Sequence, residues 1–262
     1  MPIAAKLPLG YAKGGINSIP GNVARELVKL GGNHMSVSEH RTVQPAVQPA
    51  LAQPAIADPA PLGLAAFALT TFLLSAANAN WMSHATGAAF LGYAFFYGGL
   101  VQLLAGMWEF RNRNVFGATA FASYGGFWIG LGAWVEFVKL PALSAAARVP
   151  LTLGATVSSL NHDVAWILLA FAIFNTYMML LSAQVNMAVF GVFLTLEITE
   201  VILFSAFFAA GSALTTGWIQ IGGYAGIVTA LVAWYTSAAG LSNGLAGAIR
   251  LPVGRPLLAA AA

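Results

Sequence analysis

Hydrophobic residues follow one another in long runs from Pro59 onward, with few polar side chains between them. Six such runs can be laid out, at positions 62–79, 88–108, 116–138, 164–183, 188–209 and 218–241. Since a helix rises about 1.5 Å per residue, each run can reach across the roughly 30 Å hydrocarbon core of a bilayer. The pattern therefore predicts an all-α membrane protein with six transmembrane helices.

Polar and helix-breaking residues mark what lies outside these runs. Positions 1–57 mix Gly, Pro and Gln with five basic residues and show no sustained apolar period, which predicts a mostly disordered N-terminal tail. The connections between runs are short except at 139–163, where Pro141 and Pro150 predict a loop. The expected organisation is a tail at 1–57, a six-helix transmembrane domain at 58–241 and a short C-terminal tail at 242–262.

The composition excludes several classes of function. The chain is 59% hydrophobic and only 7% charged, whereas a soluble domain carries about 25% charged residues, so a soluble globular enzyme is excluded. The net charge is +3 without a Lys/Arg stripe, so nucleic acid is not an expected partner. The chain has no cysteine, and its four histidines lack carboxylates at ligand spacing (His34, His40, His84, His162). We expect no metal and no cofactor.

The basic residues predict the orientation in the membrane. If the N-terminus is inside, nine of the eleven basic residues are cytoplasmic, and only Lys139 and Arg148 are outside. Positively charged segments tend to remain in the cytoplasm. We therefore expect both termini to be cytoplasmic in a multi-pass protein of the cell membrane.

The start of the first run has chemistry that suits an anion. Asp58 can cap a helix whose first residue is Pro59, which leaves amides near Leu62 and Gly63 directed outward at the positive end of the helix dipole. Such helix ends attract small anions. The alternative is an ordinary helix start with a proline and an acidic cap.

Three motifs carry a specific resemblance. They are Asp-Pro-Ala-Pro-Leu-Gly-Leu at 58–64, Phe-Tyr-Gly-Gly at 96–99 and Thr-Ala-Phe-Ala-Ser-Tyr-Gly-Gly-Phe-Trp at 119–128. Together they resemble the signature of the acetate uptake transporter family, also called the succinate-acetate permease family. The resemblance is specific over 58–128 and continues more loosely to Leu241 through matching run lengths.

The resemblance implies a six-helix protomer, assembled as a homo-hexamer in the bilayer, with a substrate path through each protomer. The family moves acetate and related short carboxylates such as succinate, so the chain is expected to be a transporter or channel and not an enzyme. An apolar gate in the family is made by a Phe on the first helix, a Tyr on the third and a Leu on the fifth. These match Phe67, Tyr124 and Leu196, the last by an ungapped extension from the fourth run.

Polar side chains inside the runs are candidates for the substrate path. Hydroxyls and amides can replace part of the hydration of a carboxylate, although they also form interhelical hydrogen bonds. No Lys or Arg falls inside a predicted run, which favours weak binding and quick release. The candidates are Thr70, Thr71, Asn78, Gln102, Thr119, Ser123, Asn175 and Thr176, together with Asp58, Leu62 and Gly63.

Acidic residues depart from the family pattern in two places. Asp58 replaces the usual Asn of the first motif and adds a negative charge at the expected mouth of the path. Glu197 and Glu200 lie three apart in the fifth run, where a charged carboxylate costs about 2.5 kcal/mol or more. They indicate either proton coupling or a contact to a neighbouring helix or subunit, whereas Glu109 and Glu136 lie at run ends and are expected to be solvated.

The preferred hypothesis is passage of acetate, by channel-like diffusion or proton symport. One alternative is a carrier of another small solute such as ammonium, and another is a membrane sensor or scaffold that acts through its N-terminal tail. Two glycine pairs with four-residue spacing predict close helix packing, either within or between subunits (Gly126/Gly130 and Gly222/Gly226).

Overall fold

The computed structural model describes residues 56–82, 89–148 and 150–258. The predicted disordered tail at 1–57 lies almost wholly outside these residues, as do His34, His40 and His84. Residues 54–262 form one compact unit, and every statement below concerns that unit. Every regular element among its described residues is a helix.

Six helices of this unit are long and apolar enough to cross a membrane, as the hydrophobic pattern predicts. The ends of α2, α8 and α9 fall within a few residues of the predicted runs. The π-helical turns η2 and η3 each lie inside a longer continuous helix. The spans are α2 (Ala60–Asn78), α3–η2–α4 (Phe90–Phe95, Phe96–Val101, Gln102–Arg111), α5–η3–α6 (Val115–Trp134, Val135–Lys139, Leu140–Ala146), α7 (Pro150–Ser182), α8 (Met187–Ala209) and α9 (Gly217–Gly244).

The predicted loop at 139–163 is wrong, because most of it is helical. The third span continues as α6 to Ala146, and the fourth begins at Pro150. Pro150 opens α7, where its missing N–H removes no bond inside the helix. Pro141 lies in the first turn of α6, directly after η3, and such a π turn is one way for a helix to continue through a disturbed hydrogen-bond ladder.

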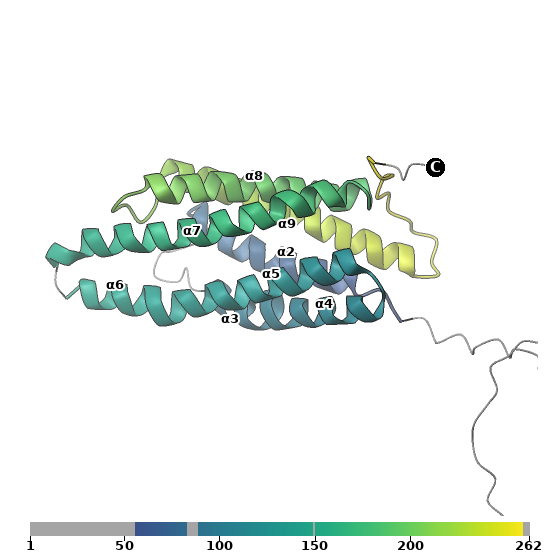
Figure 1. The fold of residues 1–262 in the computed structure, drawn as a ribbon, viewed down its shortest axis with the longest axis horizontal. Coiled ribbons are helices and arrows are strands. Elements are labelled where there is room, and N and C mark those ends of the chain that lie inside the picture. The colour runs from purple at the N-terminus through teal and green to yellow at the C-terminus, as the bar shows by residue number, and fades with distance from the viewer. Residues whose placement is uncertain (1–55, 83–88, 149, 259–262) are drawn as a thin grey trace, which may run out of the picture. The chain divides into compact units, whose positions relative to one another are not determined.

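The helices contact one another in a ring with the order α7, α8, α9, α2, α4 and α5. In Figure 1, α7 and α8 lie along one side of the bundle, α3 to α5 along the other, and α2 and α9 between them. The ring is weakest between α5 and α7, which contact each other little. A lateral groove of about 660 Å³ lies there, lined by both helices.

The two glycine pairs have different surroundings. A side chain at Gly222 would collide with Leu203, and one at Gly226 would collide with Ser75, so this pair allows close packing inside the protomer. Side chains at Gly126 and Gly130 would meet nothing, and both residues line the lateral groove. The structure thus assigns the Gly222/Gly226 pair to packing within the protomer, whereas the Gly126/Gly130 pair packs against no other described helix of the protomer.

The chain after α9 folds back onto the bundle. We call residues 250–258 the C-terminal strap. Leu257 N and Leu258 N donate to the carbonyl of Ala183, at 2.8 and 3.0 Å, and Ala188 N donates to Val253 O at 2.9 Å. The strap therefore holds the short turn between α7 and α8 through backbone bonds on both sides of it. Gly254 permits this path, because its φ of 73° is one that L side chains rarely adopt.

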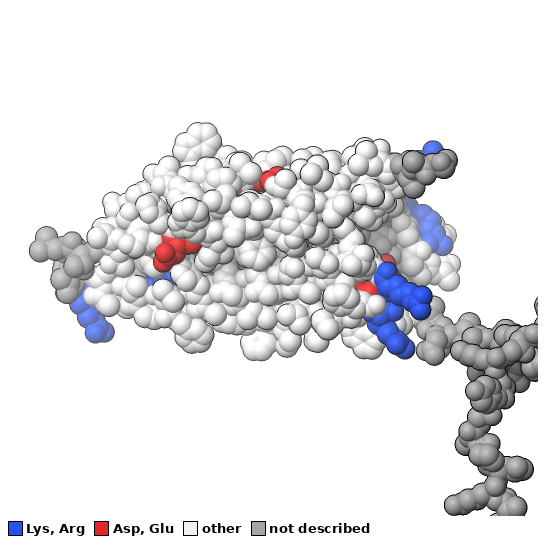
Figure 2. Space-filling model, in the orientation of Figure 1, with Lys and Arg blue, Asp and Glu red and all other residues white. Residues whose placement is uncertain are grey.

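Charged side chains gather toward the ends of the bundle. Figure 2 shows Lys and Arg at its two ends, whereas the middle of this face is almost free of charge. Many large apolar side chains on the outside are exposed, for example Phe137 at 73% and Trp166 at 63%. An exposed apolar middle with charged ends is what a bilayer demands of a spanning bundle.

Candidate functional site: two vestibules and the constriction between them

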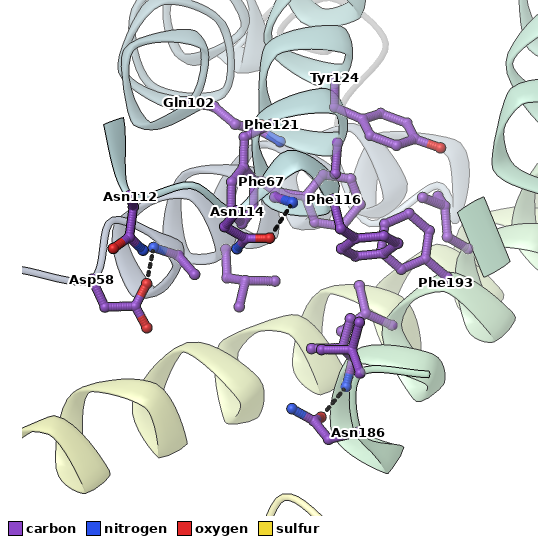
Figure 3. A pocket seen from close by; sticks show the side chains of 18 residues that line it. Asp58, Phe67, Gln102, Asn112, Asn114, Phe116, Phe121, Tyr124, Asn186 and Phe193 are labelled. Atoms are coloured by element: carbon purple, nitrogen blue, oxygen red, sulfur yellow. Dashed lines mark hydrogen bonds between the residues drawn. The ribbon is translucent and has the colours of Figure 1, made fainter. Parts of the chain in front are cut away.

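A cavity of about 270 Å³ opens at the end of the bundle where α2, α5 and α8 begin. We call it the near vestibule (Figure 3). Its mouth is marked by Asp58 and Asn112, which are exposed. Its inner end is marked by Phe67, Tyr124 and Leu196, which are buried. The walls combine apolar rings and aliphatic side chains with a few amides, including Phe116, Phe121, Phe193, Gln102, Asn114 and Asn186.

Three helix starts meet at the near vestibule, and a side chain holds each of them. The Asp58 carboxylate accepts from Ala60 N at 2.9 Å, Asn114 accepts from Gly117 N at 3.0 Å and Asn186 accepts from Val189 N at 2.9 Å. Each helix start carries a partial positive charge from its aligned peptide dipoles. The cavity is therefore favourable to an anion although no Lys or Arg lines it among the described residues.

The structure brings Phe67, Tyr124 and Leu196 to the inner end of this cavity. Their exposed fractions are 5%, 3% and 7%. The rings of Phe67 and Tyr124 meet edge to face, with centroids 5.6 Å apart and an interplanar angle of 68°. The three predicted gate residues thus come from α2, α5 and α8, the helices that all start at the near vestibule, and they line one cavity together.

A second cavity of about 280 Å³ lies at the opposite end, which we call the far vestibule. Leu74, Leu131 and Leu203 line it. Each of these residues is seven positions beyond one of the three predicted gate residues on α2, α5 and α8. Seven residues are two helical turns, or about 10.5 Å. We call these two turns of α2, α5 and α8, between the residues that line one vestibule and those that line the other, the plug.

A polar network surrounds the hydroxyl of Tyr124 inside the bundle. This hydroxyl lies 3.0 Å from Asn175 Oδ1 and 3.5 Å from Glu200 Oε1. Asn175 Nδ2 donates to Glu197 Oε2 at 2.7 Å and also to the carbonyl of Phe193. Thr176 donates to the other oxygen of Glu197 at 2.8 Å. Both oxygens of Glu197 are therefore hydrogen-bonded.

Glu200 differs from Glu197 in burial and in bonding. It is 3% exposed, its Oε1 has the long contact to Tyr124, and its Oε2 has no hydrogen-bond partner. The buried atoms Thr71 Oγ1 and Trp128 Nε1 also lack a hydrogen-bond partner. Thr71, Trp128 and Glu200 each lie four positions, or one turn, beyond a predicted gate residue. Unsatisfied polar atoms therefore lie in the plug on all three helices.

The other candidates from the sequence lie in several places. Gln102 lines the near vestibule, with its Oε1 buried and unpartnered, and Asn78 lines the far one. Ser123 faces the lateral groove, and Leu62 is 50% exposed. The hydroxyls of Thr70 and Thr119 bond backward to their own helices.

Three expectations need correction. Gly63 packs against the ring of Phe121, and its amide donates to Pro59 O at 3.1 Å, so this amide is not directed outward. Glu109 is not solvated, because it is 0% exposed and one carboxylate oxygen accepts from Asn112 Nδ2 at 3.1 Å. Lys139 lies inside a spanning helix, although the predicted run ends before it.

Sequence reasoning missed several residues that line the near vestibule. Asn114 and Asn186 each precede a predicted apolar run, so the known preference of Asn for helix caps could have found them. Phe116 and Phe193, whose ring centroids are 5.4 Å apart, look like ordinary core residues in the sequence. Only their position in the folded bundle reveals them.

The fold and the two vestibules define a multi-pass membrane protein in which six helices surround apolar residues between opposed cavities. Residues 40–255 match the GPR1/FUN34/yaaH family, and the chain belongs to this family. The resemblance drawn from the three motifs is thereby confirmed.

Several relatives are named as transport proteins. The chain is 34% identical over 184 residues to acetate permease A of Emericella nidulans, a match that covers 70% of this chain and 60% of that protein. It is 35% identical over 172 residues to ammonia transport outward protein 2 of Saccharomyces cerevisiae, covering 66% and 57%. The chain thus spans somewhat more than half the length of these curated relatives.

A solved structure has the same fold. The bacterial acetate channel SatP superposes on this chain with a TM-score of 0.63 and 27% sequence identity. The match covers 76% of this chain and 99% of SatP.

Proposed function

We propose that the protein carries acetate and related short carboxylates, such as succinate, across the cell membrane by a path within each protomer. The observation that carries the proposal is the pair of opposed vestibules separated by Phe67, Tyr124 and Leu196. The similarity to an acetate permease and to an acetate channel supports it. These features favour a transporter or channel over an enzyme.

The gate suits a small substrate with one apolar end. A ring, a phenol and a branched aliphatic side chain exclude water from a narrow passage, while the methyl group of acetate can pass between them. The near vestibule offers helix starts and amides to the carboxylate and lacks a full positive charge among its described residues. Such a site binds weakly and releases quickly.

Glu200 is the best candidate for a proton site on this path. A charged carboxylate inside a span costs about 2.5 kcal/mol or more unless it is paired or wetted, and Glu200 has an unpartnered oxygen. The ionisable groups that face it are Tyr124 from α5 and Glu197 from its own helix. With a proton, Glu200 does not repel acetate; without one, it does. Its bond to Tyr124 connects this proton to the gate.

The experiment is initial acetate uptake into proteoliposomes, with and without an inward proton gradient, over about pH 5 to 8. We expect Glu200→Gln, which mimics the protonated side chain, to retain flux and to flatten the pH dependence. Glu197→Gln is the matched control, because both of its oxygens are already hydrogen-bonded. Identical pH profiles in the wild type and Glu200→Gln would leave a channel without proton coupling. No acetate flux in the wild type would refute the function itself.

Ammonium is the second candidate substrate, because a relative bears the name ammonia transport outward protein 2. Flux of labelled acetate, compared with flux of labelled ammonium in the same proteoliposomes, distinguishes the two solutes. A sensor or scaffold that acts through the N-terminal tail is the remaining alternative, and acetate flux that persists after deletion of residues 1–50 would count against it.

We further propose that both termini are cytoplasmic and that six protomers assemble in the membrane. The charge bias of the sequence supports the orientation, and the resemblance to the transporter family supports the hexamer. A label near Ala145 should then react from outside the cell, and one after Arg255 should not. Native mass spectrometry of the protein in detergent tests the assembly.

A further inference from the structure

The far vestibule has an almost wholly apolar wall with one charged group. Among the described residues that line it, Lys139 is the only one with a charge. Uncharged polar side chains in the wall are those of Asn78, Asn161 and Thr215. The Asn161 amide already donates to the carbonyls of Gly211 and Ala213, both at 2.9 Å. Lys139, Asn78 and Thr215 are left as possible donors to a ligand.

The π turn η3 is what brings Lys139 into this cavity. The buried residues of α5, such as Tyr124, Leu131 and Val135, follow the usual spacing of about 3.6 residues per turn. Tyr124 and Leu131 lie two turns, or seven residues, apart, and a further step of seven residues reaches Val138. The wider turn of η3 shifts the register by one residue. Val138 is accordingly 45% exposed, whereas Lys139 and Leu143 line the cavity.

The depth of Lys139 permits it to meet a solute. It lies about 36 Å along the helix from Val115, at 1.5 Å per residue, which places it near the edge of the hydrocarbon core. It is half-buried, and no hydrogen bond or ion pair joins its ammonium to another described residue. A cation held there without a protein partner favours an anionic one.

We propose that Lys139 is an anion-recruiting site, which binds the carboxylate of the substrate in the far vestibule at one end of the path. The inference rests on the proposed function and deepens it, because it assigns the carboxylate a full positive charge at one end only. The competing interpretation is a lysine that merely extends its ammonium to lipid head groups.

Uptake from the side that the far vestibule faces tests the proposal. We expect Lys139→Gln to raise the KM for acetate about three- to tenfold with little change in kcat, because it removes an attraction in the vestibule and not the gate. Lys139→Arg should retain the wild-type KM. Arg148→Gln is the matched control, since Arg148 is exposed at the same end and does not line the cavity.

Salt supplies a readout that a structural role does not affect. Between about 0.01 and 1 M salt the Debye length falls from about 30 to 3 Å, so the wild-type KM should rise with salt and the Lys139→Gln KM should not. A KM for Lys139→Gln equal to that of the wild type, in protein with a normal elution profile, overturns the proposal.

Moving the charge by one residue distinguishes a lysine that acts inside the far vestibule from one that acts at the lipid surface. In the double variant Val138→Lys/Lys139→Val the charge moves by one residue, onto the exposed face of the same turn. We expect it to transport like Lys139→Gln. Wild-type behaviour of the double variant would assign Lys139 to the lipid interface. Absence of acetate flux in the wild type, in contrast, would refute the proposed function and not this assignment alone.

Discussion

The two vestibules have nearly equal volumes, about 270 and 280 Å³, but they offer an anion different electrostatics. The near vestibule has the starts of three helices, capped by Asp58, Asn114 and Asn186. The far vestibule has the ammonium of Lys139. The first set is made of partial charges fixed in the backbone, with a carboxylate at the mouth, and the second is a single full charge on a flexible stem.

The difference teaches that cavities of equal volume need not bind an anion equally well. A path with equal cavities can still hold a carboxylate more firmly at one end. Since equilibrium flux through a passive path has no preferred direction, this inequality affects the concentration at which each side saturates. It also affects the response to salt, because full charges on flexible side chains are screened more than buried dipoles.

The largest expected effect comes from removing the barrier between the vestibules. Phe67→Ala deletes the ring that meets Tyr124 edge to face, so the passage between the vestibules should become wider. We expect butyrate flux to increase about tenfold or more relative to acetate, because a steric limit of one or two methylenes is worth about that factor. Uptake of labelled acetate, propionate and butyrate measures it. Leu196→Ala should act in the same direction, and an unchanged size limit in both folded variants contradicts the gate assignment.

An intermediate effect is expected at the rim of the far vestibule. The loop between α8 and α9 is held there by two hydrogen bonds from the Asn161 side chain. At the other end of the bundle, the C-terminal strap holds the turn between α7 and α8 through backbone hydrogen bonds. Asn161→Ala removes both side-chain bonds, each worth about 0.5–1.5 kcal/mol. Amide exchange at 211–216 should accelerate roughly tenfold or more, as measured by hydrogen-exchange mass spectrometry. Exchange at 183–188 serves as the internal control and should not change.

The smallest effect is expected at the mouth of the near vestibule. Asp58→Asn keeps an oxygen for Ala60 N and removes an exposed negative charge from the mouth. The KM for acetate entering from that side should fall by about threefold or less, since exposed charges interact by about 1 kcal/mol or less. The KM for entry from the far side should be unchanged. Vesicles that hold the protein in a single orientation allow the two KM values to be measured separately. A higher KM on the near side would mean that Asp58 assists entry.

The six spans could be predicted because the bilayer imposes a length and a composition that the apolar runs report directly. The boundary between the third and fourth spans was the part predicted wrongly, because most of the predicted loop at 139–163 is helical. Pro141 and Pro150 are ordinary signs of a loop, yet one follows a π turn and the other opens a helix, where a missing N–H is harmless. The position of a π turn depends on tertiary packing, so the sequence could not show that Lys139 faces inward.

The sequence marked residues of the candidate site only where a motif or a charge inside an apolar run distinguished them. Phe67 and Tyr124 were found through the motifs around them, and Glu200 was noticed as a charge inside an apolar run. That Glu197 is fully hydrogen-bonded while Glu200 has a free oxygen follows from the rotation of α8 against α5 and α7. Apolar spans have no polar face to report such rotations, so this detail came from the structure alone.

The C-terminal strap has a consequence for biosynthesis. The turn between α7 and α8, which supplies Val185 and Asn186 to the near vestibule, is pinned by residues that leave the ribosome about 70 positions later. A nascent chain halted just after α9 therefore has all of its spans in the membrane but lacks the segment that secures this corner. Insertion and completion are thus separate events, and the opening on that side is finished last.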